Sequence, residues 1–129
     1  MKKESDAVLL RIFIGESDKH KGVPLSKYLV EFFKKEGLAG ATVLRGISGF
    51  GKSSKLHTTS ILRLSDDLPI VVEVVDRKEN IERVKPKLDD VIEEGLITEE
   101  EVKIILYEGR PAAGGCMSSN ESVPRVDIS

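Results

Sequence analysis

The chain has 129 residues, of which 40% are hydrophobic and 33% charged, and its formal net charge is −2. This length fits one domain with its own core and is short for a complete nucleotide hydrolase of the phosphate-loop class. The near balance of charge gives no electrostatic ground for binding to nucleic acids or membrane surfaces. The chain has no apolar run that would cross a bilayer and no secretion-signal pattern, so we expect a cytoplasmic protein.

The first half of the chain predicts a strand, a helix and a second strand. Residues 7–14 are apolar and rich in β-branched side chains, which is typical of a buried strand. Pro24 suits the first turn of a helix with an apolar stripe, and Gly37 is placed to end that helix. Residues 40–47 predict the second strand.

The second half begins with a long connection and then predicts another strand and helix. Residues 56–64 predict a strand or an extended loop, and residues 70–75 predict a strong strand. Asp76 and Glu79 have the spacing of a capping box at the start of the helix. Pro86 lies within the apolar stripe of this helix, so we expect a kink or a late helix start.

The end of the chain predicts one more strand and then a tail. Gly95 is expected to close the second helix, and residues 102–107 predict the last strand. Residues 98–101 also resemble a capping box and predict a short helical turn before that strand. We expect a domain of residues 1–109, followed by a flexible tail of residues 110–129 that is rich in Gly, Ser and Pro.

The predicted order of elements is strand, helix, strand, strand, helix, strand. This order is typical of the α+β ferredoxin-like βαββαβ sandwich, an antiparallel four-stranded sheet with two helices on one face. The other face would carry apolar side chains from four strands and would be uncovered in a monomer. Such a patch usually marks an interface, so we expect an oligomer.

A glycine-rich stretch follows the second predicted strand. Residues 46–53 match the G-x-x-x-x-G-K-S/T phosphate loop, whose backbone N–H groups and lysine contact phosphates. A functional phosphate loop opens a helix, whereas this stretch lies between two predicted strands and lacks a helix dipole. Three interpretations remain: a hydrolase that uses Lys52, a hairpin loop with chance glycines, and a phosphate-contacting loop, which Arg45 and Lys55 favour.

The central stretch resembles the PII signalling proteins. Residues 49–52 (GFGK) are similar to the motif that ends the second strand in that family. The pair at residues 57–58 (HT) is similar to part of the family's long mobile loop, and residues 68–75 resemble the strand after it. Residues 15–16, 24–25 and 37–43 are similar to a prokaryotic subgroup of PII-like proteins. The resemblance covers residues 7–108 in element order.

The resemblance implies a homotrimer that binds an adenine nucleotide in the clefts between subunits and is a regulatory protein, not an enzyme. Nucleotide binding would reshape the mobile loop, which then engages a target protein such as a membrane transporter or an enzyme. The nucleotide-binding residues that we expect are Ser48, Gly49, Phe50, Gly51, Lys52, Arg77, Lys103 and Arg110. No catalytic residues and no nucleic-acid partner are expected.

Two of these residues have more than one expected role. Phe50 either packs over the nucleotide or wedges under the loop, and the sequence does not separate these roles. Arg77 either reaches a phosphate or pairs with Glu73 or Glu79. Both residues therefore need a structure to place them.

The chain departs from the PII pattern in two places. The family has a basic, glycine-rich segment before its last strand, where this chain has residues 97–103, with three glutamates and Lys103. Those glutamates would repel a triphosphate, so AMP or ADP is at least as well suited as ATP. The family's modifiable tyrosine has no counterpart in residues 57–64, so we expect no control by uridylylation.

A metal-binding trimer of the CutA-like class is the remaining alternative, because that class shares the fold. His20 and His57 are the only histidines, and Cys116 is the only cysteine. They do not form a cluster with the spacing of metal ligands, so we predict no metal site.

Overall fold

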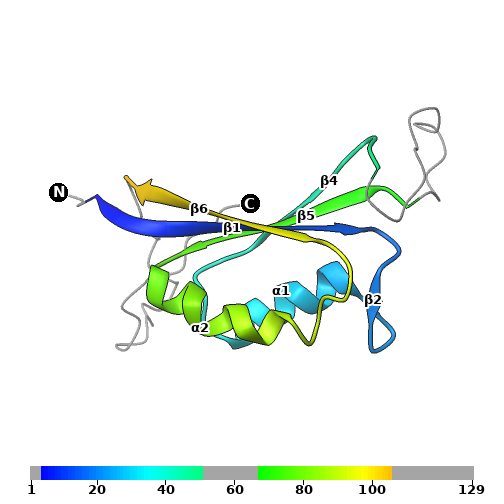
Figure 1. Ribbon diagram of the computed structural model, residues 1–129, viewed down its shortest axis with the longest axis horizontal. Helices are drawn as coiled ribbons and strands as arrows, with labels where there is room; N and C mark the ends of the chain where they lie inside the picture. The colour runs from blue at the N-terminus through cyan, green and yellow to red at the C-terminus, as the bar shows by residue number, and fades with distance from the viewer. Residues whose placement is uncertain (1–3, 51–66, 106–129) are drawn as a thin grey trace, which may run out of the picture.

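The computed structural model in Figure 1 describes residues 4–50 and 67–105. The elements in chain order are β1 (Ser5–Gly15), β2 (Lys19–His20), β3 (Val23–Pro24), α1 (Leu25–Lys35), β4 (Thr42–Arg45), β5 (Pro69–Asp76), α2 (Lys78–Leu88) and β6 (Leu96–Ile104). A sheet of order β4-β5-β1-β6 is antiparallel in each of its pairings, which confirms the ferredoxin-like βαββαβ prediction. The β2–β3 hairpin was not predicted.

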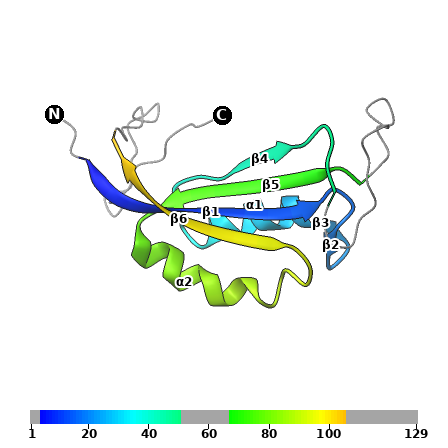
Figure 2. The same cartoon turned by 45° about the horizontal axis from the view of Figure 1, so that its top comes forward.

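Both helices lie on the same face of the sheet, and no helix of the described chain lies on the other face (Figures 1 and 2). Burial alternates along β1 and β5, because successive side chains of a strand point to opposite faces. The core between the sheet and the helices includes Leu10, Ile12, Leu29, Phe33, Val72, Ile81 and Leu88. Burying one such side chain contributes roughly 1.5–3 kcal/mol, so this layer holds the sheet and the helices in a fixed arrangement.

Helix α1 ends at the predicted glycine. Gly37 has a φ of +85°, a left-handed conformation that glycine adopts without steric cost. The N–H of Leu38 donates to the carbonyl of Phe33, and the N–H of Gly37 donates to the carbonyl of Lys34, each at 3.1 Å. These two hydrogen bonds form a Schellman motif, which satisfies carbonyls that the helix leaves unpaired.

The predicted capping box at the start of α2 is wrong. The N-cap residue is Arg77, and no side chain caps the helix there. Asp76 is the last residue of β5, and only 3% of it is exposed. Its carboxylate accepts hydrogen bonds from the N–H of Ala39 at 2.9 Å and from the Asn80 side chain at 2.7 Å. Asp76 therefore joins the α1–β4 connection to α2 instead of capping the helix.

Helix α2 also differs from its predicted ends. It begins at Lys78, so Pro86 does not delay its start, and it ends at Leu88 instead of at Gly95. Proline supplies no N–H to the helical hydrogen bonds, and the helix stops two residues after it. Gly95 instead allows the chain to pass close to β1, since a Cβ there would lie 2.8 Å from the carbonyl oxygen of Phe13.

The helical turn predicted at residues 98–101 is wrong, because this stretch is part of β6. Every residue of β6 lies opposite a residue of β1, and this pairing supplies the ladder hydrogen bonds. The glutamates of β6 point to alternate faces. Glu99 pairs with Lys85 of α2 at 2.6 Å, whereas Glu100 pairs with Arg11 at 3.2 Å on the opposite face.

Strand β4 is shorter than the predicted strand at residues 40–47. The N–H of Gly46 still donates to the carbonyl of Pro69 in the β4–β5 register, but Pro69 has no N–H to return a bond. The last strand ends at Ile104 within the described part. The predicted strand or loop at residues 56–64 and the tail of residues 110–129 lie outside the described residues.

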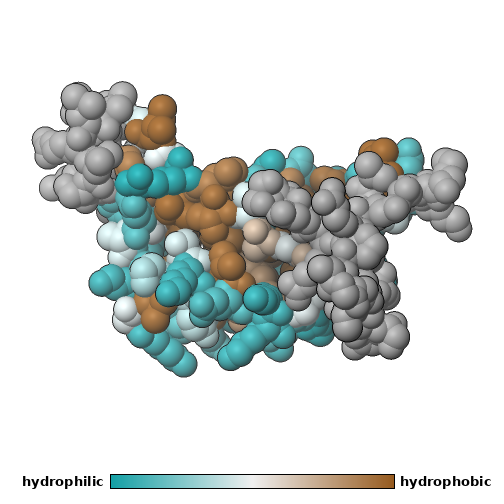
Figure 3. Space-filling view, turned by 180° about the vertical axis from the view of Figure 1, so that it is seen from behind, coloured by the Kyte–Doolittle hydropathy of each residue, from teal (hydrophilic) through white to brown (hydrophobic). Residues whose placement is uncertain are grey.

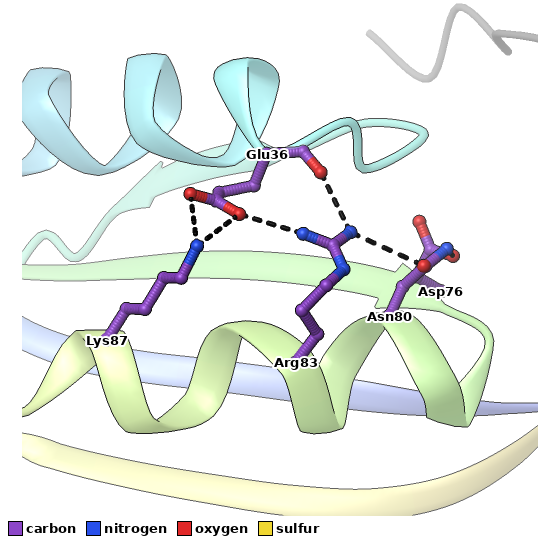
Figure 4. Close-up of polar contacts among 5 residues, drawn as sticks. All are labelled: Glu36, Asp76, Asn80, Arg83 and Lys87. Atoms are coloured by element: carbon purple, nitrogen blue, oxygen red, sulfur yellow. Dashed lines mark hydrogen bonds and ion pairs between the residues drawn. The ribbon is translucent and has the colours of Figure 1, made fainter.

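A cluster of charged side chains joins the two helices (Figure 4). Arg83 of α2 donates to the Glu36 carboxylate and to the Glu36 backbone carbonyl, each at 2.8 Å. Lys87 donates to both carboxylate oxygens of Glu36 at 3.0 Å. The C-terminal end of α1 is therefore held against α2.

In the described part of the chain, no helix is long and apolar enough to span a bilayer.

Candidate functional site

The glycine-rich stretch leaves β4 and folds over the first residue of β5. The N–H of Gly46 donates to the carbonyl of Pro69 at 2.7 Å. A Cβ at Gly46 would lie 2.8 Å from Cγ of Pro69, and one at Gly49, where φ is +154°, would lie 3.0 Å from it. Side chains at these two positions would push the stretch away from Pro69. We call residues 46–50 and 67–69 the β4–β5 base.

The turn after β1 is bound to the β4–β5 base from the other side. The N–H of Glu16 donates to the carbonyl of Leu68, and the N–H of Ser17 donates to Oδ1 of Asp67, both at 2.8 Å. The N–H of Gly15 donates to the side chain of Asp18 at 3.0 Å. The bonds to Asp67 and Leu68 fix the segment just before β5 to the turn that follows β1.

An ion pair links this turn to β4. Arg45 Nε lies 3.0 Å from Oε2 of Glu16, and an Nη of Arg45 donates to Oε1 at 3.2 Å. Both carboxylate oxygens thus meet one guanidinium, an arrangement that arginine also makes with phosphate. The two side chains are 44% and 36% exposed, so solvent and ligands reach the pair.

Three of the predicted site residues, Ser48, Gly49 and Phe50, lie at the β4–β5 base. The side chains of Phe50 and Ile47 are 72% and 74% exposed. Phe50 is therefore accessible and not buried under the base. The predicted residues Gly51, Lys52 and Arg110 lie outside the described part of the chain.

Arg77 and Lys103 lie at the opposite end of the sheet from the β4–β5 base. Arg77 follows the last residue of β5, and its N–H donates to the Asp76 carboxylate at 2.7 Å. Lys103 of β6 is opposite Asp6, with Nζ 3.7 Å from a carboxylate oxygen. Strand β5 has eight residues, so at about 3.4 Å per residue its ends lie roughly 24 Å apart. One chain alone does not bring all the predicted residues together.

Exposed apolar side chains lie along β4, which is an edge strand of the sheet. Seen from behind, hydrophobic side chains gather across the middle of the molecule (Figure 3). On β4, Val43 is 41% exposed and Leu44 is 49% exposed. This apolar edge leads directly into Ile47 and Phe50 of the β4–β5 base.

The sheet face without helices is also apolar, except for a charged group at its centre. Arg11 lies between Glu73 at 2.8 Å and Glu100 at 3.2 Å. The hydrogen bond that Arg11 donates to the Glu73 carboxylate is the main cause that raises the pKa of Arg11, and Glu100 adds to it. Around this group lie the half-buried Leu9, Phe13, Val71 and Val75 and the exposed Leu44 and Leu96.

The geometry of the glycine-rich stretch differs from that of a nucleotide hydrolase. The next described element after it is β5, which pairs antiparallel with β4. A phosphate loop of that class instead joins a strand to a helix within a parallel βαβ unit. Within residues 4–50 and 67–105, no group of three His, Cys, Asp or Glu side chains could hold a metal ion.

Sequence reasoning did not identify Asp67 as part of the site, nor Arg45 as the partner of Glu16. Asp67 lies 50 residues from Ser17, and Glu16 lies 29 residues from Arg45, so spacing along the chain gives no sign of these contacts. The only signal was that Glu16 and Asp67 each lie in a polar turn at the end of an apolar strand.

Comparison with protein families shows which group of proteins this chain matches. The family model DUF190, described as "Uncharacterized ACR, COG1993", matches residues 7–104. A UPF0166 protein of Aquifex aeolicus (strain VF5) is 42% identical over 97 residues, which cover 75% of this chain and 91% of the relative. The UPF0166 protein MJ1524 of Methanocaldococcus jannaschii is 45% identical over 92 residues, which cover 70% and 84%.

A solved structure extends the comparison to the fold. CPII from Thiomonas intermedia K12, a nitrogen regulatory PII-like protein bound to ADP, AMP and bicarbonate, matches with a TM-score of 0.59. The match covers 80% of this chain and 99% of CPII, at 12% sequence identity, and thus concerns the fold. The predicted resemblance to PII-like proteins is confirmed: this chain belongs to the DUF190 family and has the fold of PII-like proteins.

Proposed function

We propose that this protein is a PII-like regulatory protein that binds an adenine nucleotide at the β4–β5 base. The observation that carries the proposal is the glycine-rich stretch packed on Pro69, between antiparallel strands of a PII-like fold. There a close-packed backbone, a guanidinium and exposed apolar side chains lie within a few residues of one another. That combination suits a ligand with both phosphates and an aromatic base.

The two parts of a nucleotide have matching partners at the base. The N–H groups of residues 47–50, together with Lys52, suit the phosphates. The exposed side chains of Ile47 and Phe50 offer an apolar surface to the adenine ring. CPII, which shares the fold, is bound to ADP and AMP, and this supports an adenine nucleotide over other anions. AMP, ADP and ATP remain candidates.

The site is completed in a homotrimer. The uncovered, apolar sheet face supplies a surface for self-association. A cyclic assembly sets one end of a sheet against the neighbouring subunit, which is how Arg77, Lys103 and Arg110 of one subunit would reach the β4–β5 base of another. This accounts for predicted ligands that lie at opposite ends of the same chain.

The ligand state is passed to a target protein through residues 51–66, which connect the two sides of the β4–β5 base. A nucleotide that binds the base also restricts how this segment leaves the base and returns to it. The regulator consists of residues 1–109, with 110–129 as its tail, and acts in the cytoplasm without an enzymatic reaction of its own.

Calorimetric titration of the full chain with AMP, ADP and ATP tests this function. We expect at least one nucleotide to bind, and Lys52→Ala to weaken binding by about tenfold or more, because it removes a charged phosphate ligand. Lys34→Ala is the matched control: it removes an exposed lysine of α1, far along the chain from the glycine-rich stretch.

Other outcomes of the same experiment would contradict the proposal. Steady phosphate release from ATP that Lys52→Ala abolishes would support a hydrolase. Tight binding of divalent metal without heat from any nucleotide would support a CutA-like trimer. A solution mass corresponding to one chain would contradict the homotrimer.

A further inference from the structure

We propose that Arg45 is a phosphate ligand of this nucleotide site and that Glu16 occupies its guanidinium until the nucleotide arrives. The proposal rests on the nucleotide-binding function above and specifies how the site selects phosphates. Arg45 is the last residue of β4 and immediately precedes the glycine-rich stretch.

In the ion pair, the Glu16 carboxylate contacts the Arg45 guanidinium in the way that a phosphate would. Two nitrogens of Arg45 face the two oxygens of one carboxylate, at 3.0 and 3.2 Å. A phosphate presents its oxygens to a guanidinium in the same forked manner. The guanidinium is therefore already held in an orientation suited to an oxyanion.

The neighbouring carboxylates of Asp18 and Asp67 accept backbone hydrogen bonds, a role that Glu16 does not have among the described residues. Asp67 accepts the N–H of Ser17, and Asp18 accepts the N–H of Gly15. Both act as backbone acceptors that shape the turn. Glu16 instead directs its carboxylate across the turn onto the cation of β4.

Both members of the pair are fixed to the β4–β5 base. The backbone of Glu16 is bound to the carbonyl of Leu68, and Arg45 lies opposite Ile70 in the β4–β5 ladder. A phosphate held by N–H groups of residues 47–50 would thus lie next to the Arg45 side chain.

The exchange of partners is favourable because the resting pair is exposed. Ion pairs at such exposure contribute little to stability, so releasing Glu16 costs little. A terminal phosphate carries nearly two charges and three acceptor oxygens, more than the single charge of the carboxylate. An uncharged nucleoside cannot displace Glu16, so the pair selects ligands that carry phosphate.

The test compares ADP and adenosine in calorimetric titrations of the wild-type chain and four variants. Arg45→Gln should weaken ADP binding by about tenfold to a hundredfold and leave adenosine unchanged. Glu16→Gln should strengthen ADP binding by about twofold to fivefold, because the resting competitor is gone. Glu82→Gln, which removes the same charge from a pair with Lys85 on α2, should change neither.

Arg45→Lys keeps the charge and should retain part of the ADP affinity, which separates loss of a ligand from loss of the fold. Equal weakening of ADP and adenosine by Arg45→Gln would mean a structural role and would overturn the proposal. Weaker ADP binding in Glu16→Gln would overturn it too, since Glu16 would then support the ligand. If the wild-type chain binds ADP and Arg45→Gln binds it equally, this inference alone fails. If the wild-type chain binds no nucleotide, the proposed function fails with it.

Discussion

The carboxylate of Asp67 accepts a hydrogen bond from the backbone N–H of Ser17 at 2.8 Å, across 50 residues of chain. The same oxygen would lie 2.7 Å from a Cβ placed on Gly15. Position 15 is therefore closely fitted to Asp67, and any side chain there must displace the carboxylate. This contact holds the turn after β1 against the β4–β5 base.

Asp67→Ala should lower the free energy of unfolding by about 1 kcal/mol, because one charge-assisted hydrogen bond is lost. Asp67→Asn keeps an acceptor oxygen and should lose less. Gly15→Ala acts on the same bond, so the double variant should be less destabilised than the sum of the single variants. Urea unfolding compares the wild-type chain with these variants, the double variant being Gly15→Ala with Asp67→Ala, and additive effects would show that Gly15 and Asp67 act independently.

Glu36→Ala should destabilise the protein by about 1 kcal/mol, because Arg83 and Lys87 of α2 both lose their carboxylate partner at the C-terminal cap of α1. The matched control is Glu31→Ala, which removes an exposed glutamate of the same helix that has no ion pair within the described residues. Thermal unfolding of the two variants gives the comparison. Equal effects would contradict a stabilising role for the cluster in Figure 4.

Asp76→Ala should be the most destabilising of these changes, at about 3 kcal/mol. Its buried carboxylate accepts the N–H groups of Ala39 and Arg77 and the side chain of Asn80, and the alanine variant leaves these donors without their acceptor. Asp76→Asn retains one acceptor oxygen and should fall between wild type and alanine. Denaturant unfolding checks the order, and a loss below about 1 kcal/mol would contradict it.

Lys85 should titrate above the ordinary lysine value of 10.5, since its hydrogen bond to Glu99, and a second one to Glu82, raise its pKa. A cation with a raised pKa stabilises the fold below the ordinary value, and this stabilisation is lost as the pH rises through the raised pKa. Carbon-13 NMR of the lysine side chains measures the titration. Glu99→Gln should lower the pKa of Lys85, and an unchanged value would show that Glu99 is not the cause.

Local sequence patterns predicted the fold because each element carried its own periodicity. The alternating burial of β5 and the spacing of Leu25, Leu29 and Phe33 are properties of neighbouring residues. Predictions failed where distant pairing decided the structure. Residues 98–101 resemble a capping box but pair with β1, and Asp76 resembles an N-cap but serves the distant Ala39.

The candidate site was only partly predictable for the same reason. The motif at residues 46–53 pointed to a phosphate-contacting stretch, because glycine and lysine in that spacing have a direct chemical meaning. The turn that holds this stretch has no such motif in the sequence. The contacts of Glu16 and Asp67 join parts of the chain that only the folded sheet brings together. The opposite placement of Arg77 also depends on the sheet, not on the local sequence.

The most direct test of the account is amide NMR of the full-length, deuterated protein during titration with ADP. We predict that the amide resonances of Gly46, Ser48 and Gly49 shift and saturate, with smaller changes in the core of α2. Adenosine should produce weaker changes at Gly46 and Ser48 than ADP does, because it carries no phosphate. Unchanged resonances at the β4–β5 base, or saturable shifts confined to other parts of the molecule, would contradict a nucleotide site at this base.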